Sequence, residues 1–310
     1  MTPDPLISRY SKIVVKSLRN GKVIPFLGAG ANMCGRPDGV DWQEGTYPPS
    51  GAELTDYLAD AYEYPENDGD LLRVSQWVKL TNNEGILFDD LHNVFDHPYA
   101  PNELHTFLAE LPKVLRDQNP KVEQCGQLIL TTNYDDVLER AFAKADEAVD
   151  VVFYETRQDA QHFVHLTPDG ERVPIDEPGT YRKFALEERS VILKIHGQVD
   201  RGDAGNDTFV ITDDDYIDYL AGAGALNLIP AYLTSRLRGY DLLFLGYSLR
   251  DWNLRVILRQ IRADQGIKRG GWSIQLNPSE LDKEFWKPQG IAVIDARLED
   301  WVGGMREQFQ

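Results

Sequence analysis

Three apolar, strand-like runs that each end abruptly in small or polar residues constrain the fold of this chain more than any other feature. The runs, each with a notable residue just beyond its end, are 23–27 with Gly28, 127–131 with Asn133, and 191–195 with His196. In an open α/β sheet the carboxyl ends of neighbouring parallel strands converge on one crevice. We therefore expect a glycine turn, an asparagine and a histidine to meet at one edge of a sheet.

The remaining pattern completes an α/β domain. An amphipathic helical pattern at 6–20 precedes the first strand, and further strand-like runs occupy 241–246, 272–277 and 291–295 before a C-terminal helix. Strands that alternate with helices predict a Rossmann-like, mostly parallel sheet with helices on both faces. We interpret residues 1–310 as a single domain, because this length is enough for one large core with an insertion.

Two stretches interrupt the alternation. Residues 45–120 carry helical spacing without a parallel-strand pattern, and a capping box, Ser50-x-x-Glu53, announces the first helix. This predicts a helical insertion that covers the crevice. Residues 146–189 mix short β-rich pieces with turn signals, and we expect them to form a variable excursion before the next core strand.

The charge of the chain restricts its partners. Lys and Arg number 32 and Asp and Glu number 50, which gives a net charge of −18. A chain this acidic repels a phosphate backbone, so we expect no direct nucleic-acid binding. An anionic dinucleotide remains possible, because a helix N-terminus offers backbone N–H groups irrespective of net charge.

The two cysteines and the absence of long apolar runs limit the chemistry and the location. Cys34 and Cys125 are far apart in sequence, which excludes a disulfide framework or a paired-cysteine zinc site, and we expect no metal. The N-terminal residues do not resemble a signal peptide, and no apolar run is long enough to span a bilayer. We therefore expect a cytoplasmic protein that does not contact membranes.

The first strand leads into a partial dinucleotide fingerprint. Gly28 and Gly30 match its first two glycines, while Met33 stands in place of the third. A tight turn that binds nothing is the alternative. The missing glycine, and the absence of an acidic strand end ~20 residues further on, disfavour a dehydrogenase. No P-loop is present, which disfavours ATP hydrolysis.

Asn133 and His196 each have two interpretations. Asn133 either caps a helix expected at 134–145, with Asp135 and Asp136 complementing the helix dipole, or holds a water or ribose hydroxyl with its amide. His196 is either a satisfied core residue or a base, since an unperturbed imidazole has a pKa of ~6.5.

Two later strand ends add polar groups. Gly246-Tyr247-Ser248 and Asn277 each follow an apolar run. At a shared edge these residues could hydrogen-bond phosphate or ribose, although they are also ordinary strand terminators.

Taken together and in this order, these segments resemble the sirtuin-like (SIR2-like) superfamily, especially its bacterial branch of NAD-hydrolysing antiphage-defence domains. The resemblance runs from about residue 20 to 305, and the matching segments are Gly28–Ala31, Thr132–Asp135, Lys194–Gly197, Gly246–Asp251 and Asn277.

The resemblance implies that NAD is the substrate. It implies that Asn133 and His196 line the nicotinamide–ribose pocket, that Asp135 supports it, and that all three belong to the catalytic machinery. The residues implied to bind the rest of the nucleotide are Gly28, Ala29, Gly30, Ala31, Asn32, Thr132, Gly246, Tyr247, Ser248 and Asn277.

The expected reaction is cleavage of the nicotinamide–ribose bond to nicotinamide and ADP-ribose, or a cyclic form. Deacylating sirtuins carry a four-cysteine zinc module, which this chain cannot build. Two alternatives remain, a zinc-free NAD-dependent protein deacylase and a catalytically silent module that binds NAD or ADP-ribose and changes its assembly state.

The resemblance also implies regulation, because an unregulated NAD hydrolase would poison its own cell. We expect an antiphage-defence effector that forms a homo-oligomer or acts beside a separate HerA-like ATPase or sensor protein. The trigger and the choice between linear and cyclic product stay open at this point.

Overall fold

The computed structural model describes residues 5–66, 68–119, 124–157, 160–221, 225–247, 255–259 and 270–309. The strands that run parallel to a neighbour are β1 (Val23–Leu27), β2 (Leu128–Thr131), β3 (Val149–Arg157), β6 (Ser190–Lys194), β9 (Asp241–Leu245), β10 (Gly271–Gln275) and β11 (Ile291–Asp295). Two antiparallel strands, β4 (Ala160–Leu166) and β5 (Arg172–Ile175), extend one edge. The order across this sheet is β11-β10-β9-β1-β2-β6-β3-β4-β5, and it confirms the predicted mostly parallel α/β class.

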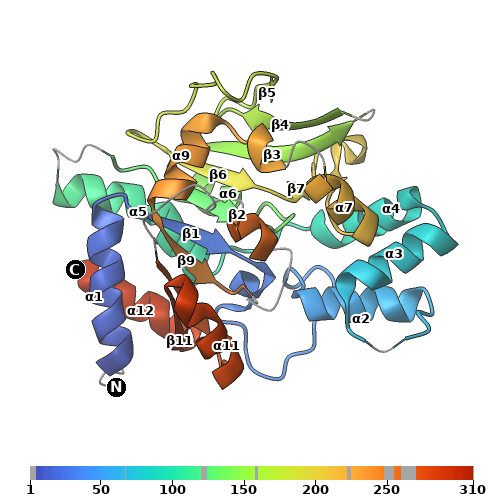
Figure 1. Cartoon of the computed structure of the whole chain (residues 1–310), viewed down its shortest axis with the longest axis horizontal. Helices are drawn as coiled ribbons and strands as arrows, with labels where there is room; N and C mark the ends of the chain where they lie inside the picture. The colour runs from blue at the N-terminus through green and yellow to red at the C-terminus, as the bar shows by residue number, and fades with distance from the viewer. Residues whose placement is uncertain are drawn as a thin grey trace.

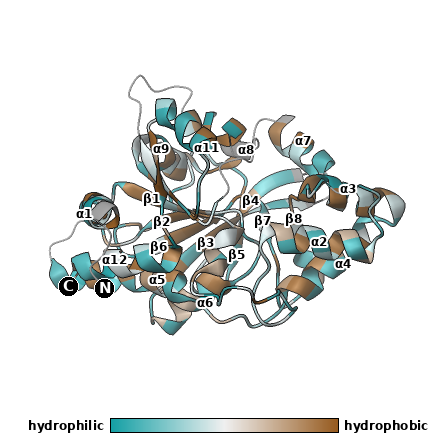
Figure 2. Ribbon diagram, turned by 90° about the horizontal axis from the view of Figure 1, so that it is seen from below, coloured by the Kyte–Doolittle hydropathy of each residue, from teal (hydrophilic) through white to brown (hydrophobic). Residues whose placement is uncertain are grey.

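Helices cover both faces of the sheet (Figure 2). One face carries α1 (Pro5–Arg19), α5 (Glu103–Gln118), α6 (Val137–Lys144) and α12 (Leu298–Phe309). The other carries α7 (Asp213–Ala221), α8 (Ala225–Leu228), α9 (Ala231–Gly239) and α11 (Glu280–Trp286). No helix among the described residues combines the length and apolar character needed to cross a bilayer.

Short elements complete the described chain. Residues 255–259 are helical. A two-stranded sheet pairs β7 (Gly197–Gln198) with β8 (Thr208–Phe209), and the 3-10 helices are η1 (Ala29–Met33), η2 (Ala204–Asn206) and η3 (Lys287–Gln289).

Alternate residues of the central strands bury opposite faces. In β1, Ile24 and Phe26 pack on the α9 and α11 side, whereas Val23 and Leu27 pack on the α1 and α12 side. Strands buried on both faces read as continuous apolar runs, which explains why the sequence reveals them so clearly.

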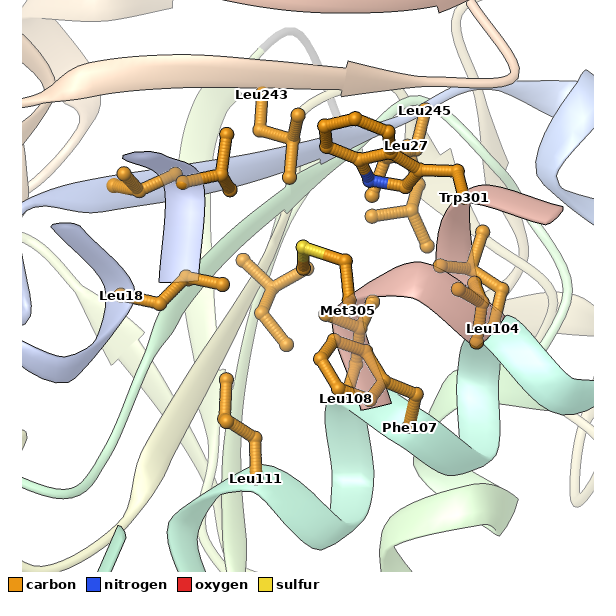
Figure 3. Packing of buried hydrophobic residues seen from close by; sticks show 14 of the residues in the cluster. Leu18, Leu27, Leu104, Phe107, Leu108, Leu111, Leu243, Leu245, Trp301 and Met305 are labelled. Carbon is orange, nitrogen blue, oxygen red and sulfur yellow. The ribbon is translucent and has the colours of Figure 1, made fainter. Parts of the chain in front are cut away.

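The core beneath β1 and β9 joins the two ends of the chain (Figure 3). Leu18 of α1, Leu108 of α5, and Trp301 and Met305 of α12 each expose 1% or less of their surface and belong to one apolar cluster with Leu243 of β9. Full burial of such side chains stabilises a fold by roughly 1.5–3 kcal/mol each. This apolar layer holds in place the central strands, whose carboxyl ends carry the polar residues.

The expected helices at 45–120 are present, but they divide between two places. The helices α2 (Gly51–Ala61), α3 (Leu71–Thr81) and α4 (Glu84–Phe95) lie beyond the carboxyl ends of the parallel strands (Figure 1). They share their own apolar cluster, which includes Tyr134 and Phe209 from the sheet side. The fourth helix, α5, packs against the sheet instead. We name α2, α3 and α4 the helical cap.

The segment at 146–189, expected to be an excursion, instead supplies the core strand β3. This strand pairs in parallel with β6 from Val149 to Phe153 and antiparallel with β4. Its apolar residues are buried on both faces, with Val152 and Phe153 both 0% exposed. The short β-rich pieces and turn signals of this segment did not reveal the strand as part of the core.

Candidate functional site

The register of the central strands brings their carboxyl ends to one edge, as expected. Leu27 of β1 pairs with Thr131 of β2 and Leu245 of β9, and Thr131 pairs with Lys194 of β6. In the sheet β1 lies between β2, which follows it in the chain, and the much later strand β9. The strand order therefore reverses at β1, and open α/β sheets bind ligands at the carboxyl ends of the strands at such a topological switch point.

The glycines of the first turn are required by backbone packing. The Gly30 N–H donates to the Gly246 carbonyl at 2.9 Å, and a Cβ on Gly30 would lie 2.6 Å from that oxygen. Gly246 has a φ of +64°, and its own Cβ would lie 1.9 Å from the Ala31 nitrogen. The turn after β1 and the turn after β9 therefore approach so closely that Gly30 and Gly246 leave no room for a side chain.

A cavity of about 550 Å³ opens at this edge beneath the helical cap, and we name it the Asn133 cavity. The cap contributes Ser50 and Gly51 at the start of α2, Leu71 and Leu72 of α3, and Phe95 of α4. The residues singled out from sequence that line it are Gly28, Ala29, Gly30, Thr132, Asn133, His196, Gly246 and Tyr247.

Asn133 does not cap the following helix. That helix starts at Val137, whose N–H donates to Asp135 Oδ1 at 3.1 Å, so the expected start at residue 134 is wrong. The Asn133 backbone N–H donates to Thr131 Oγ1 at 3.0 Å, which fixes the loop. The buried Asn133 Oδ1 has no hydrogen bond to any described residue. Asn133 thus lines the cavity with a carboxamide oxygen that no described residue satisfies.

His196 lines the same cavity and is 3% exposed. Its Nδ1 lies 3.2 Å from the Tyr216 hydroxyl, while Nε2 is buried without a hydrogen bond to the described residues. Burial lowers the pKa of the imidazole to about 3. The ring is therefore neutral near pH 7, which corrects the expectation of an unperturbed base titrating at ~6.5.

This burial predicts a pH dependence of stability. Between pH ~6.5 and the folded-state pKa of about 3, the unfolded chain binds a proton at His196 that the folded chain does not. Stability is therefore lost as the pH falls through this window and is unaffected above it. We expect wild type to lose about 2–3 kcal/mol more than His196→Asn between pH ~6.5 and ~4.5.

Urea unfolding at a series of pH values measures this difference. His105 is also buried with a pKa lowered to about 4 by burial, but it is present in both proteins and its effect cancels. Parallel stability curves for wild type and His196→Asn would contradict the burial of a neutral imidazole.

Three residues of the expected site do not line the cavity: we expect Ala31 and Asn32 to bind the nucleotide and Asp135 to support its pocket. Ala31, Asn32 and Asp135 line neither this cavity nor the second one described below. Asn32 Nδ2 donates to Asp135 Oδ2 at 3.0 Å, so this pair ties the glycine turn to the Asn133 loop. The other carboxylate oxygen of Asp135 accepts the Val137 N–H. Because both oxygens are engaged within the protein, Asp135 supports the site by holding the Asn133 loop in place.

Lys194 is a supporting residue that the sequence analysis left without a role. Its ammonium is 2% exposed and donates to the Asp135 carbonyl at 2.6 Å and to Glu139 Oε1 at 2.7 Å. A buried charge requires such partners. Lys194 therefore holds the Asn133 loop from the side away from the cavity. The sequence feature that could have revealed this role is a lysine within an apolar strand.

The start of α2 is tied to the glycine turn by an ion pair. Arg36 Nη2 lies 2.7 Å from Glu53 Oε1. Although burial alone would raise the pKa of Glu53, the hydrogen bond from Arg36 holds it below its ordinary value. The predicted capping box between Ser50 and Glu53 is confirmed, so the same carboxylate also fixes the first turn of α2. This wall of the Asn133 cavity is well anchored.

A second cavity of about 540 Å³ lies beyond the ends of β9, β10 and β11, and we name it the Asn277 cavity. It shares Gly30, Gly246 and Tyr247 with the Asn133 cavity. Asn277 adopts a φ of 51°, and its N–H donates to Asp295 Oδ1 at 2.9 Å. The two cavities are therefore adjacent along one edge. Ser248 lies outside the described residues.

The chain is similar in sequence to known proteins. A family model described as a SIR2-like domain matches residues 127–294, which is more than half of the 310 residues. The chain is 24% identical over 293 residues to defense-associated sirtuin 2 of Bacillus subtilis, covering 92% of this chain and 24% of the relative.

Two further relatives carry the name NAD(+) hydrolase ThsA. The one from Enterococcus faecium is 28% identical over 264 residues, covering 84% of this chain and 44% of the relative. The one from Bacillus cereus is 23% identical over 298 residues, covering 92% of this chain and 50% of the relative. The chain thus spans between a quarter and a half of the length of these relatives.

Proposed function

The chain belongs to the SIR2-like domain family, and on that premise we propose that it is an NAD⁺ glycohydrolase that releases nicotinamide from NAD⁺. One observation carries the proposal. Two buried polar atoms that have no partner among the described residues, Asn133 Oδ1 and His196 Nε2, belong to residues that line one cavity at the switch point of the sheet. Unpaired buried polar groups are costly unless a ligand satisfies them. The names of the ThsA relatives support NAD⁺ as that ligand.

The two cavities suggest how NAD⁺ lies on the protein. The nicotinamide ribose would occupy the Asn133 cavity, and the adenosine would occupy the Asn277 cavity. The pyrophosphate would cross the shared floor of Gly30, Gly246 and Tyr247. Glycine at this floor lets the phosphates approach the backbone closely. Contacts from Ser248 to the phosphates remain a prediction of the sequence.

The proposed chemistry uses the neutral character of both side chains. The bond between C1′ and the nicotinamide nitrogen breaks with its electron pair moving to the ring, which neutralises the pyridinium cation and leaves an oxocarbenium-like sugar. Asn133 positions a water, or a ribose hydroxyl for a cyclic product, against C1′. His196 Nε2 accepts the proton of this nucleophile. Because the nucleophile becomes acidic as it bonds to C1′, a weakly basic imidazole is sufficient.

The names of the relatives support a cellular role, which is part of the proposal. The name of the Bacillus subtilis relative associates it with defence, and we propose that this chain is a regulated antiphage effector. Regulation would act through a homo-oligomer or a separate HerA-like ATPase or sensor protein. The helical cap is the element placed to transmit it, since α2, α3 and α4 all contribute to the wall of the Asn133 cavity.

Incubation of the purified chain with NAD⁺, followed by mass spectrometry, tests the activity. We expect nicotinamide and ADP-ribose, or its cyclic form, in equal amounts and without any peptide. NAD⁺ loss that requires an acyl-lysine peptide would favour the zinc-free deacylase instead. NAD⁺ binding measured by calorimetry, without nicotinamide release even for the oligomeric protein, would favour the silent binding module.

A further inference from the structure

Two tyrosines of α7 pack edge-on against the His196 ring. The ring of Tyr216 lies 5.1 Å from it at 81°, and the ring of Tyr219 lies 5.8 Å from it at 89°. Only the Tyr216 hydroxyl reaches the imidazole, at 3.2 Å from Nδ1. The Tyr219 hydroxyl is buried without a hydrogen bond to the described residues. Both tyrosines thus contact the imidazole with their rings, but only Tyr216 also makes a polar contact with it.

The first turn of α7, which carries Tyr216, is held firmly. Asp215 N–H donates to Thr212 Oγ1 at 3.2 Å, and Thr212 N–H donates to Asp215 Oδ2 at 2.9 Å, which completes a capping box. From the helical cap, Lys79 Nζ lies 3.2 Å from Asp215 Oδ1, and Ser75 Oγ donates to the Ile211 carbonyl at 3.1 Å. Tyr216 therefore meets His196 from a fixed support.

We propose that Tyr216 is the positioning residue of His196, a residue that lines the Asn133 cavity, and that its phenolic oxygen accepts a hydrogen bond from Nδ1–H and so leaves the lone pair on Nε2. This inference rests on the proposed function, in which Nε2 accepts a proton. A neutral imidazole carries one N–H, and a tyrosine hydroxyl can accept it or donate to the bare nitrogen, so the direction of this contact decides which state Nε2 adopts.

The contact is compatible with both states of the ring. Before proton transfer, Nδ1–H donates to the Tyr216 oxygen and Nε2 is the acceptor. After transfer, both nitrogens carry protons and Nδ1–H still donates to the same oxygen. The ring keeps its orientation through the step. Without the phenolic oxygen, no partner would hold the proton of the neutral ring on Nδ1. A ring that carries its proton on Nε2 cannot accept the proton of the nucleophile at that nitrogen.

Tyr216→Phe tests the proposal because it keeps the ring and removes the oxygen. Tyr219→Phe is the matched control, since it lies on the same helix and contacts the same imidazole. We expect Tyr216→Phe to lower kcat for NAD⁺ cleavage about 10- to 100-fold, as for loss of an orienting partner of a functional histidine. KM should change little, and Tyr219→Phe should match wild type in both constants.

Nitrogen-15 NMR of histidine-labelled protein reads the tautomer directly and does not require activity. The His196 signals, assigned with His196→Asn, should show a protonated Nδ1 in wild type and Tyr219→Phe and a mixture of tautomers in Tyr216→Phe. A protonated Nε2 in wild type, or an unchanged spectrum in Tyr216→Phe, would overturn the proposal.

The activity measurements separate this proposal from the proposed function. If wild type released no nicotinamide, the proposed function would fail. Equal kcat in wild type and Tyr216→Phe would contradict only the role of Tyr216.

Discussion

Replacement of Asn133 by alanine is expected to lower kcat for NAD⁺ cleavage by about 10²–10³-fold, the loss typical of removing one preorganised polar group from an active site. The amide lines the cavity, and its buried Oδ1 has no hydrogen bond to the described residues. Its removal therefore takes away the proposed anchor of the nucleophile without breaking an internal hydrogen bond of the side chain. Nicotinamide release, followed by chromatography, measures the effect.

Asn20→Ala is a suitable control for this variant. Asn20 is exposed at the end of α1, where its side chain donates to the Lys16 carbonyl. Both variants should unfold at temperatures close to that of wild type, and only Asn133→Ala should show the lowered kcat. Wild-type turnover by a folded Asn133→Ala protein would refute the catalytic assignment.

Replacement of Gly246 by alanine is expected to destabilise the protein by at least about 4 kcal/mol, the range in which a substitution breaks a specific structural requirement. The residue has a φ of +64°, and the added Cβ would lie 1.9 Å from the Ala31 nitrogen and 2.2 Å from the Gly30 carbonyl carbon. Relief requires the two turns to separate, which would also open the floor shared by both cavities. Urea unfolding monitored by circular dichroism measures the loss.

Gly239→Ala provides the comparison. Gly239 ends α9, and a Cβ added there has no heavy atom within 4 Å. Its stability should stay within about 0.5–1 kcal/mol of wild type. If Gly246→Ala were as stable as Gly239→Ala, the close contact between the turns after β1 and β9 would be wrong.

The sequence predicted the frame of the site because parallel strands obey a simple rule. Apolar runs buried on both faces are conspicuous, and their carboxyl ends must share an edge. Asn133, His196 and Asn277 could thus be assigned to that edge from the residues that precede them. The structure places the first two on one cavity and the third on its neighbour.

Other features depended on contacts between distant segments, which local patterns do not encode. The partners of Asp135 are one example, because its oxygens accept hydrogen bonds from Asn32 and from the first turn of α6. The lowered pKa of His196 arises from its burial, where tyrosines of α7 pack against its ring. The spacing of Tyr216 and Tyr219 places them on one helix face, yet nothing in the sequence showed that the face meets His196.

A crystal structure of Asn133→Ala with NAD⁺ bound tests the central claim most directly, because slow turnover preserves the substrate. The account predicts adenosine in the Asn277 cavity, the pyrophosphate over Gly30 and Gly246, and the nicotinamide ribose in the Asn133 cavity within hydrogen-bond reach of His196 Nε2. A dinucleotide bound in the reverse direction, or one that leaves the Asn133 cavity empty, would contradict it.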